Sequence, residues 1–417
     1  MIRMTIFIVL LAMLIYSNMD GNIPEPIPEQ FKVKVMDLCI KTYRHTLNVL
    51  VSLGLTTPFS EFERKLSDRF ILLMTTGFPW VRGYDSQLQI TDTTMKGVHV
   101  RMYQPVSSLQ HKQRPVLVYF HGGWWSLLSI DSYDPLMRRI AKDSGVVIIS
   151  VNYRLSPQHP FPVPLHDCLD VVEYVIENSA TLNIHPQKIA IGGDSAGGNM
   201  AAAISLRLKK KLALQLLIVP VLQLANWNTS SFIENANYLS QSANNKNYIL
   251  LVLNYLNIDH KYEHDFLNNN HTSQAFKQFY FTEILDQNLW LPKRYIRSEL
   301  LRENIDLQTE FGNEELFSLI ESRITDPMMS PLLADDDMLE DLPMTYIVTS
   351  GFDIVRDDGI MFSERLKQVG QKVILKHYEE AFHTSLIFPH GPLKLEVGVR
   401  IVQDIVKVLR NTLRSSL

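Results

Sequence analysis

Residues 188–198 read KIAIGGDSAGG, and this stretch decides the fold. Its first four residues are typical of a β-strand, and the Ala-rich segment Asn199 to Leu208 after the glycines is typical of a helix. A strand, a sharp turn and a helix around Gly-x-Ser-x-Gly hold a serine hydroxyl above the end of a sheet. The stretch therefore predicts that Ser195 is a nucleophile and that the Ala196 amide faces a developing oxyanion. In isolation the five-residue pattern also fits a Gly-rich loop without chemistry.

The same rhythm of strands and helices extends over most of the chain. Beyond Gly97, short β-branched runs alternate with helical stretches, which indicates an α/β fold with a mainly parallel central sheet and helices on both faces. The expected strands are Val98–Tyr103, Val116–Phe120, Val146–Val151, Lys188–Ile191, Leu214–Val219, Thr345–Val348 and Val373–His377. A chain of 417 residues can bury one large core, so we expect a single catalytic domain over residues 20–417.

Two segments lie outside this rhythm. A Pro-rich linker at residues 23–29 leads into apolar positions between Phe31 and Leu55 that recur at helical spacing, which predicts an amphipathic helix. The stretch from Val221 to about Thr325 is an insertion, with Tyr248–Leu256 as a helix. We expect a helical cap over the site, built from residues 30–75 and 221–325.

A second glycine-rich turn follows an earlier strand. Residues 116–120 read VLVYF and lead into HGGWW at residues 121–125. Backbone amides that approach a substrate closely need glycine, so Gly122 and Gly123 predict an oxyanion site, with His121 as part of the motif. A simple β-turn has the same composition, but the presence of both this segment and the sharp turn around Ser195 in one chain favours the oxyanion site.

A serine at neutral pH needs a base that a third group orients. Asp353 follows one expected strand and His383 follows the last one, and the carboxyl ends of parallel strands meet at one edge of a sheet. Asp353 and His383 therefore complete a predicted triad with Ser195. Competing acids and bases are Asp357, Asp358, His377 and His390. We expect the two aspartates to cap a helix starting near Gly359, and the two histidines to lie within a strand and in a loop.

The composition excludes several classes of partner. Forty basic and forty-four acidic residues give a net charge of -4 without a basic block, so we expect no nucleic-acid partner. Two cysteines, Cys39 and Cys168, are too few for a disulfide framework or a thiolate zinc site, and the sequence leaves open whether they pair. Serine chemistry needs no metal or organic cofactor, and we expect neither.

The N-terminus carries a targeting signal. Arg3 precedes an uncharged apolar run from Met4 to Met19, barely long enough to span the membrane of the endoplasmic reticulum. No small-x-small cleavage site follows, and the basic end favours the cytoplasm. We therefore expect a signal-anchor at residues 1–19 and a single-pass type II protein with a lumenal catalytic domain; the alternative is cleavage and secretion. Asn228 and Asn270 begin glycosylation sequons that suit a lumenal domain, although so short a pattern also arises by chance.

Together these motifs resemble the arylacetamide deacetylase-like proteins of the hormone-sensitive lipase group of α/β-hydrolases. The matches run in order along nearly the whole chain: the N-terminal apolar segment, His121-Gly122-Gly123, NYRLSPQHPFP at 152–162, GDSAGG at 193–198, SPLLAD at 330–335, DIVRDDG at 353–359 and Phe382-His383. The resemblance implies the triad Ser195, Asp353 and His383, attachment to the endoplasmic-reticulum membrane, and hydrolysis of lipophilic acyl esters or arylamides.

The chain departs from this family at one position. The family usually has three glycines after the histidine, whereas the third residue here is Trp124. If the second and third amides are the donors, Gly123 and Trp124 supply them, and tryptophan disfavours positive φ and brings a large ring. Trp124 therefore bears on the shape of the oxyanion hole and on the size of the acyl pocket.

Two interpretations of the function compete. The first is a serine hydrolase that cleaves a small-molecule lipophilic ester or amide through an acyl-enzyme. The second is a catalytically weak or inactive binding protein on the same scaffold, which Trp124 alone favours. A trypsin-like protease is excluded because the order of the triad residues differs and the body is α/β. The pattern indicates neither an oligomeric state nor a specific substrate, although the apolar residues at 248–253 favour lipophilic esters unless they are simply the cap's core.

Overall fold

The computed structural model describes residues 23–77, 83, 85–110, 113–236, 238, 245–297 and 312–414. The leader at residues 1–19 lies outside these ranges. Within them, no helix combines the length and the apolar character needed to cross a membrane.

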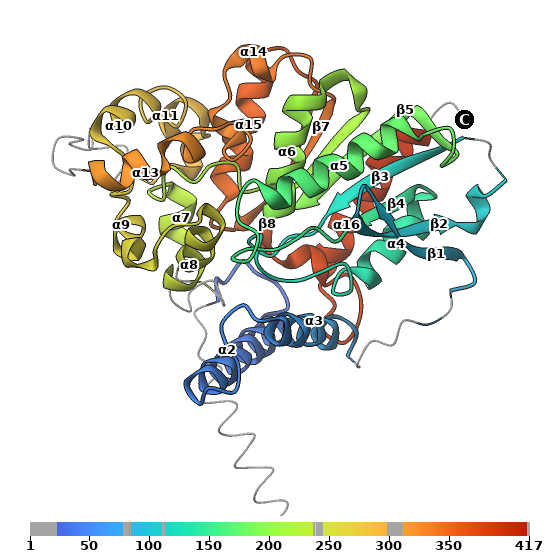
Figure 1. Cartoon of the computed structure of the whole chain (residues 1–417), viewed down its shortest axis with the longest axis horizontal. Coiled ribbons are helices and arrows are strands. Elements are labelled where there is room, and N and C mark those ends of the chain that lie inside the picture. The colour runs from blue at the N-terminus through green and yellow to red at the C-terminus, as the bar shows by residue number, and fades with distance from the viewer. Residues whose placement is uncertain are drawn as a thin grey trace, which may run out of the picture.

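A single sheet of eight strands forms the centre of the molecule, in the order β1-β2-β4-β3-β5-β6-β7-β8 (Figure 1). The strands are β1 (Leu88–Met95), β2 (Val98–Pro105), β3 (Arg114–Phe120), β4 (Val147–Val151), β5 (Ile184–Asp194), β6 (Leu214–Ile218), β7 (Met344–Phe352) and β8 (Val373–Phe382). β2 pairs antiparallel with β1 and β4, and every pair from β4 to β8 is parallel. The expected α/β fold is confirmed, with β1 as an additional edge strand.

Helices cover both faces of the sheet, and the central strands are therefore buried on both sides. On β3, Val116, Val118 and Phe120 belong to one hydrophobic core, and Leu117 and Tyr119 belong to the other. The first core contains residues of α5 (Val163–Glu177), α6 (Ala196–Leu208) and α15 (Arg356–Gln368). The second contains residues of α4 (Asp134–Ser144) and α16 (Glu396–Leu409). Two apolar faces explain why the central strands are continuous apolar runs.

The remaining helices come from the two segments expected to form a cap. The N-terminal segment forms α2 (Gln30–Ser52) and α3 (Glu61–Thr76), and the helix expected between Phe31 and Leu55 is confirmed as α2. The insertion contains α7 (Ser230–Asn235), α8 (Asn245–Leu256), α9 (Glu263–Leu267), α10 (Gln274–Tyr280), α11 (Gln287–Trp290) and α13 (Glu314–Ile324), and α14 (Asp336–Leu339) follows before β7. The expected helix at Tyr248–Leu256 is α8. Figure 1 shows α2 below the sheet and the insertion helices beside it.

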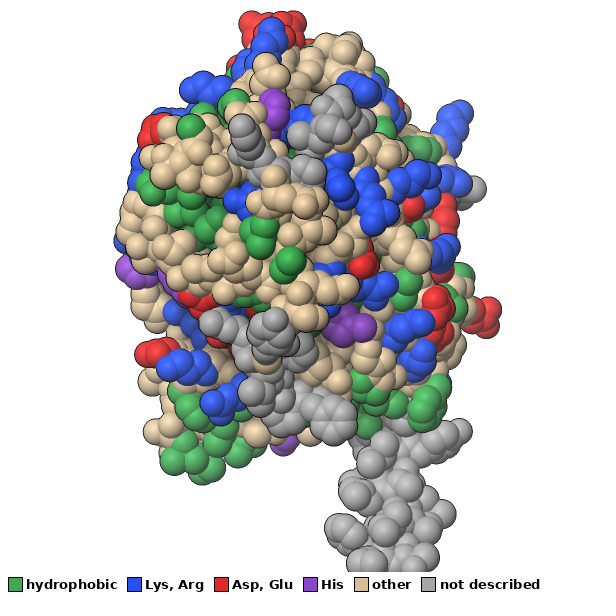
Figure 2. All heavy atoms as spheres, turned by 90° about the vertical axis from the view of Figure 1, so that its right-hand side faces the viewer, with side chains coloured by type: hydrophobic (Ala, Val, Ile, Leu, Met, Phe, Trp, Pro, Cys, Tyr) green, Lys and Arg blue, Asp and Glu red, His purple; other side chains and the backbone are tan. Residues whose placement is uncertain are grey.

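The α2–α3 hairpin exposes apolar side chains on its outer surface. They are Phe31, Val49, Leu53, Leu55, Phe62 and Leu73. Figure 2 shows hydrophobic side chains gathered at the lower end of the molecule, where Figure 1 places the hairpin. Half of the large hydrophobic side chains that are exposed among the described residues therefore lie on this one element.

Candidate active site

The turn between β5 and α6 holds Ser195 in a strained backbone conformation. Ser195 has φ 55° and ψ -120°, outside the regions that L-residues favour. The turn is too tight for side chains on either side, because a Cβ on Gly193 would lie 2.4 Å from the Gly197 carbonyl carbon and one on Gly197 would lie 2.0 Å from the Phe120 oxygen. The sequence thus supplies glycine where the turn needs it, and the hydroxyl stands beyond the carboxyl end of the strand.

Two neighbouring strands bring an acid and a base to this hydroxyl. Asp353 directly follows β7 and His383 directly follows β8. His383 Nε2 lies 2.9 Å from Ser195 Oγ, and His383 Nδ1 lies 2.9 Å from each carboxylate oxygen of Asp353. Asp353 is fully buried, so its hydrogen bond to the imidazole is shielded from water. The structure therefore brings the three residues of the predicted triad together in the order that proton transfer needs.

Nearby charges favour the protonated form of the histidine. Burial lowers the pKa of His383, but the Asp353 carboxylate, which also bonds to the ring, and the Asp194 carboxylate outweigh burial and hold this pKa above its ordinary value. The imidazolium that forms when the serine is deprotonated is thereby stabilised.

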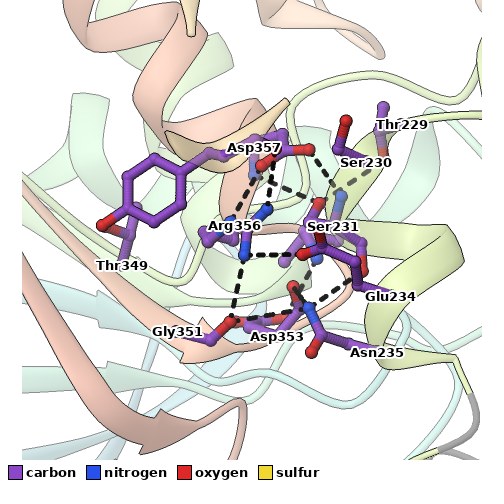
Figure 3. A network of polar contacts seen from close by, with 12 residues as sticks. Thr229, Ser230, Ser231, Glu234, Asn235, Thr349, Gly351, Asp353, Arg356 and Asp357 are labelled. Carbon is purple, nitrogen blue, oxygen red and sulfur yellow. Dashed lines mark hydrogen bonds and ion pairs between the residues drawn. The ribbon is translucent and has the colours of Figure 1, made fainter. Parts of the chain in front are cut away.

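The loop that carries Asp353 is fastened to the insertion (Figure 3). Asn235, at the end of α7, donates through Nδ2 to the carbonyl oxygens of Asp353 (3.2 Å) and Gly351 (3.5 Å). Arg356, the first residue of α15, donates through Nη1 to Glu234 of α7 at 3.1 Å and through Nε to Asp357 at 2.9 Å. The insertion therefore positions the acid of the triad as well as covering the site.

The competing aspartates, Asp357 and Asp358, help to hold the insertion against the loop of Asp353. The expectation that they cap a helix starting near Gly359 needs correction. Helix α15 begins at Arg356, and the carboxylates of its first turn accept hydrogen bonds from the insertion. Asp357 accepts from the Ser231 amide at 2.6 Å, and Asp358 accepts from the Leu222 amide at 2.9 Å. Burial raises the pKa of Asp358 to about 7 against the opposing effect of its hydrogen bonds.

The competing histidines lie where the sequence placed them. His377 is part of β8, where its Nδ1 lies 2.9 Å from Thr349 Oγ1 and its Nε2 lies 3.2 Å from Glu379. His390 lies in the loop before α16. Neither bonds to the nucleophile in the structure.

The glycine-rich turn after β3 is held by the residue that precedes the nucleophile. The Gly122 amide lies 3.2 Å from Tyr133 Oη and 3.2 Å from Asp194 Oδ1, and it is therefore engaged. Across the described ranges, no hydrogen bond occupies the amides of Gly123, Trp124 or Ala196. These three amides therefore remain available to an oxyanion, as expected from the sequence, whereas the Gly122 amide, also expected in this role, bonds to Tyr133 and Asp194.

A buried polar cluster, which the sequence analysis did not identify, fixes this turn. Asp194 accepts hydrogen bonds from Tyr119 Oη at 2.7 Å and Tyr133 Oη at 2.6 Å, and burial raises the pKa of this carboxyl group despite them. His121 lies at 2.8 Å, through Nδ1, from the Gly122 oxygen, and stacks on Tyr153. Burial lowers the pKa of His121 to about 4, so the ring is neutral and holds the turn as a hydrogen-bond donor. The sequence signals for this cluster were His121, already named as part of the motif, and the position of Asp194 beside Ser195.

Comparisons with known proteins identify the family. A family model described as alpha/beta hydrolase fold matches residues 117–283 and 298–387. Neutral cholesterol ester hydrolase 1 of Bos taurus is 31% identical over 99% of this chain and 99% of its own length. Arylacetamide deacetylase of Bos taurus is 32% identical over 97% of each chain. The chain belongs to the arylacetamide deacetylase-like group of the α/β-hydrolases.

Solved structures of esterases share the fold of this hydrolase. A bacterial heroin esterase has a TM-score of 0.60 and 23% identity and covers 86% of this chain and 93% of its own. The esterase of the archaeon Pyrobaculum calidifontis has a TM-score of 0.56 and 24% identity over 84% of this chain and 92% of its own. At these identities the likeness concerns the fold alone.

Trp124, where this hydrolase departs from the family motif, has the left-handed backbone that the motif's glycine would adopt easily. Its φ is 52°, next to Gly123 with φ 120°. A Cβ on Gly123 would lie 2.2 Å from the Leu127 oxygen, so that position needs glycine, whereas the tryptophan bears the strain of a positive φ. Its ring stacks on Tyr248 of α8 with centroids 5.6 Å apart. The Trp124 ring therefore connects the turn to helix α8 of the insertion.

A pocket opens beside the catalytic histidine of this hydrolase. Its wall combines residues after β7 and β8 with Trp124, Tyr248 and one face of α2. The lining residues are Val33, Met36, Asp37, Ile40, Arg44, Trp124, Tyr248, Ile354, Phe382, His383 and Thr384. Both expected cap segments therefore contribute to the pocket wall.

Two other groups of residues from the sequence analysis, the cysteines and the sequon asparagines, take no part in the hydrogen bonds of the triad. Cys39 and Cys168 are free thiols. In the part of the chain that the structure describes, no group of three or more His, Cys, Asp or Glu side chains could hold a metal ion. The sequon residues Asn228 and Asn270 are half-buried in the insertion.

Proposed function

We propose that this protein hydrolyses carboxylic esters or amides with Ser195 as the nucleophile. The observation that carries the proposal is the continuous hydrogen-bonded chain from Ser195 Oγ through His383 to buried Asp353, with 2.9 Å at each step. The strained elbow and the unoccupied amides of Gly123, Trp124 and Ala196 support it. These are the parts that acyl transfer to serine requires.

Each residue has a defined role in the proposed mechanism. His383 Nε2 takes the proton from Ser195 Oγ as the oxygen attacks the carbonyl carbon, and Asp353 holds the ring in the tautomer that accepts it. The tetrahedral oxyanion receives hydrogen bonds from the three amides. His383 then gives its proton to the leaving alcohol or amine. Water, activated by the same histidine, releases the acid from the acyl-enzyme.

A small-molecule lipophilic ester or arylamide is the proposed substrate class. The names of the relatives support it, one being a cholesterol ester hydrolase and another an arylacetamide deacetylase. Apolar side chains provide most of the pocket wall, including Val33, Met36, Ile40 and Phe382. Burying the apolar part of an ester against them favours binding by about 0.8 kcal/mol for each methylene.

The second candidate function is a binding protein with weak or no activity. The observation that favours it is the positive φ of Trp124, because strain in the oxyanion turn is a cost that a catalyst must offset. The two functions differ in whether Ser195 is activated, which a covalent probe measures directly.

The experiment is labelling of the full-length protein in detergent with a fluorophosphonate, together with turnover of p-nitrophenyl esters. Ser195→Ala should lose both labelling and turnover. Ser205→Ala is a matched control, because Ser205 is a buried serine of the neighbouring helix whose hydroxyl lies outside the site. If the folded wild-type protein neither labels nor hydrolyses any ester, the hydrolase proposal is wrong and the binding function is favoured.

The proposed location is the endoplasmic-reticulum membrane, with residues 1–19 as a type II anchor and the catalytic domain in the lumen. The apolar run from Met4 to Met19 supports it, as does the exposed apolar surface of the α2–α3 hairpin a few residues downstream. The sequons at Asn228 and Asn270 suit the same compartment. Protease protection in intact microsomes, lost on adding detergent, would support this orientation, and release of the protein into the medium would indicate the secreted alternative.

A further inference from the structure

The pocket beside His383 has polar atoms that the proposed chemistry does not use. Asp37 Oδ1 and Tyr248 Oη both belong to residues of the pocket wall, and each residue is only 4% exposed. Neither atom has a hydrogen-bond partner within the part of the chain that the structure describes. A buried carboxylate oxygen without a donor is costly, so a ligand that supplies one is favoured.

The other groups around these atoms fix their orientation. Lys41, one helical turn along α2, lies 2.5 Å from Asp37 Oδ2, which leaves Oδ1 as the acceptor without a partner. The ring of Tyr248 is stacked on Trp124 with an interplanar angle of 21°. Both polar atoms are therefore held by contacts that do not depend on a ligand, which is the condition for a preformed subsite.

The local charge selects the kind of group that this subsite takes. Arg44 is two turns along α2 from Asp37, lines the same pocket, and interacts electrostatically with both Asp37 and Tyr248. Lys41 and Arg44 are both cationic and both interact with Asp37, so a further cation such as an amine is disfavoured there. A hydroxyl is neutral, donates to a carboxylate and accepts from a phenol, so it is the group whose hydrogen-bonding capacity matches both atoms.

We propose that Asp37 and Tyr248 form a subsite that binds a hydroxyl group of the substrate, away from the bond that is cleaved. The inference rests on the proposed hydrolase function and narrows its substrate class from lipophilic esters in general to esters that carry a free hydroxyl. The apolar lining binds the hydrocarbon part, and the hydroxyl selects among substrates of equal length.

The test compares matched esters on full-length enzyme in detergent. One series is 4-nitrophenyl alkanoates with and without a hydroxyl at successive carbons of the acyl chain, and the other is alkanoate esters of simple alcohols against monoesters of the corresponding diols. The measured quantity is the ratio of kcat/KM for the hydroxylated and plain members of each pair. Because both values come from the same variant, a general change in activity cancels.

Wild-type enzyme should prefer the hydroxylated ester by about tenfold or more at one hydroxyl position in at least one series, which is the lower end of the size of a hydrogen bond to a charged group. Asp37→Leu should bring the ratio to about one, and Tyr248→Phe should lower it. Asp37→Asn keeps an acceptor oxygen and should retain part of the preference, which also covers the case that the leucine variant does not fold.

Asp68→Leu is the matched control. Asp68 lies on the neighbouring helix α3, its Oδ1 is also buried without a partner, and it is not part of the pocket wall. This variant should keep the wild-type ratio. A ratio near one at every position in a wild-type enzyme that hydrolyses the plain esters would overturn the subsite and leave the hydrolase proposal standing. Absence of all hydrolysis would instead overturn the hydrolase function itself.

Discussion

Replacing Trp124 with glycine restores the residue that the family motif has at this position, and its consequences follow from the structure. The amide N–H of residue 124 is kept, so all three oxyanion donors remain. The change removes an indole ring from the pocket wall and removes the strain of a non-glycine residue at φ 52°. Stability and substrate range are therefore both altered, while the catalytic groups are not.

The change in stability is a difference between opposing effects. Removing the strain of a non-glycine residue in the left-handed region stabilises the folded variant by about 1–2 kcal/mol. Loss of the stacked pair with Tyr248 costs about 0.5–1.5 kcal/mol, and the added freedom of glycine in the unfolded chain costs about 0.5–1 kcal/mol. Loss of the ring's remaining burial adds about 1–2 kcal/mol. We therefore expect Trp124→Gly to be destabilised by about 1–2 kcal/mol in thermal or denaturant unfolding.

The change in activity depends on the length of the acyl chain. For short esters, kcat/KM should stay within a few-fold of wild type because the donors are unchanged. For longer chains, each methylene that enters the space of the indole should add about 0.8 kcal/mol of binding, or about fourfold in kcat/KM. The profile of kcat/KM against acyl length should therefore extend to longer chains in the variant.

The assay is a p-nitrophenyl ester panel of increasing acyl length, measured beside unfolding curves. Lys209→Gly is the control for strain, because Lys209 has φ 45° at the end of α6 and lies outside the pocket wall. It should leave the chain-length profile unchanged. If Trp124→Gly folds and its profile coincides with that of wild type, the ring does not limit the acyl pocket and the reasoning is wrong.

Two further predictions concern the triad and the oxyanion turn. Activity requires the neutral triad histidine, whose pKa is raised, so kcat/KM of the wild type should fall on the acid side with a midpoint above about 6.5. Asp353→Asn should move that midpoint to lower pH and lower kcat by about 10⁴-fold, the effect known for such a substitution in a serine protease; an unmoved midpoint in stopped assays across pH would contradict it. Tyr133→Phe removes hydrogen bonds to both Asp194 and the Gly122 amide, so kcat should fall about tenfold with little change in KM. The Tyr119 hydroxyl bonds only Asp194, so Tyr119→Phe should lose similar stability in melting curves with a smaller loss of kcat. Equal losses of kcat in the two variants would refute a role for the turn.

The sequence predicted the parts of the fold that follow from local pattern. The central strands are buried on both faces and are therefore continuous apolar runs, which made them recognisable. Strand β1 was not expected, because it lies at the sheet edge and most of its eight residues are exposed, so it carries no apolar pattern. Asp353 and His383 were predicted because residues that follow parallel strands gather at one edge.

The contacts between distant segments were not predictable in the same way. Asp194 stands beside the nucleophile in sequence, but its partner Tyr133 is 61 residues away and has no motif of its own. The amide of Gly122 was expected among the oxyanion donors, yet it donates to Asp194 and Tyr133 instead. Asn235 holds the loop of the triad acid from a short helix of the insertion. Such partners are fixed by the packing of the whole chain, and a single sequence does not display them.

Trp124 was recognisable from the sequence as a motif position, but its contacts were visible only in the structure. As a motif position it suggested a damaged oxyanion hole, yet the structure shows its amide unoccupied and its ring packed against Tyr248 of α8. Tyr248 in turn lines the same pocket as Asp37 and Arg44 of α2, so one residue of the oxyanion turn contacts the wall that selects the substrate. A change at residue 124 should therefore have a larger effect on which esters the pocket accepts than on the rate at which Ser195 reacts. The departure from the family motif therefore concerns substrate specificity. A search for the natural substrate should start from esters that fit a pocket lined by the Trp124 indole and the Asp37 carboxylate.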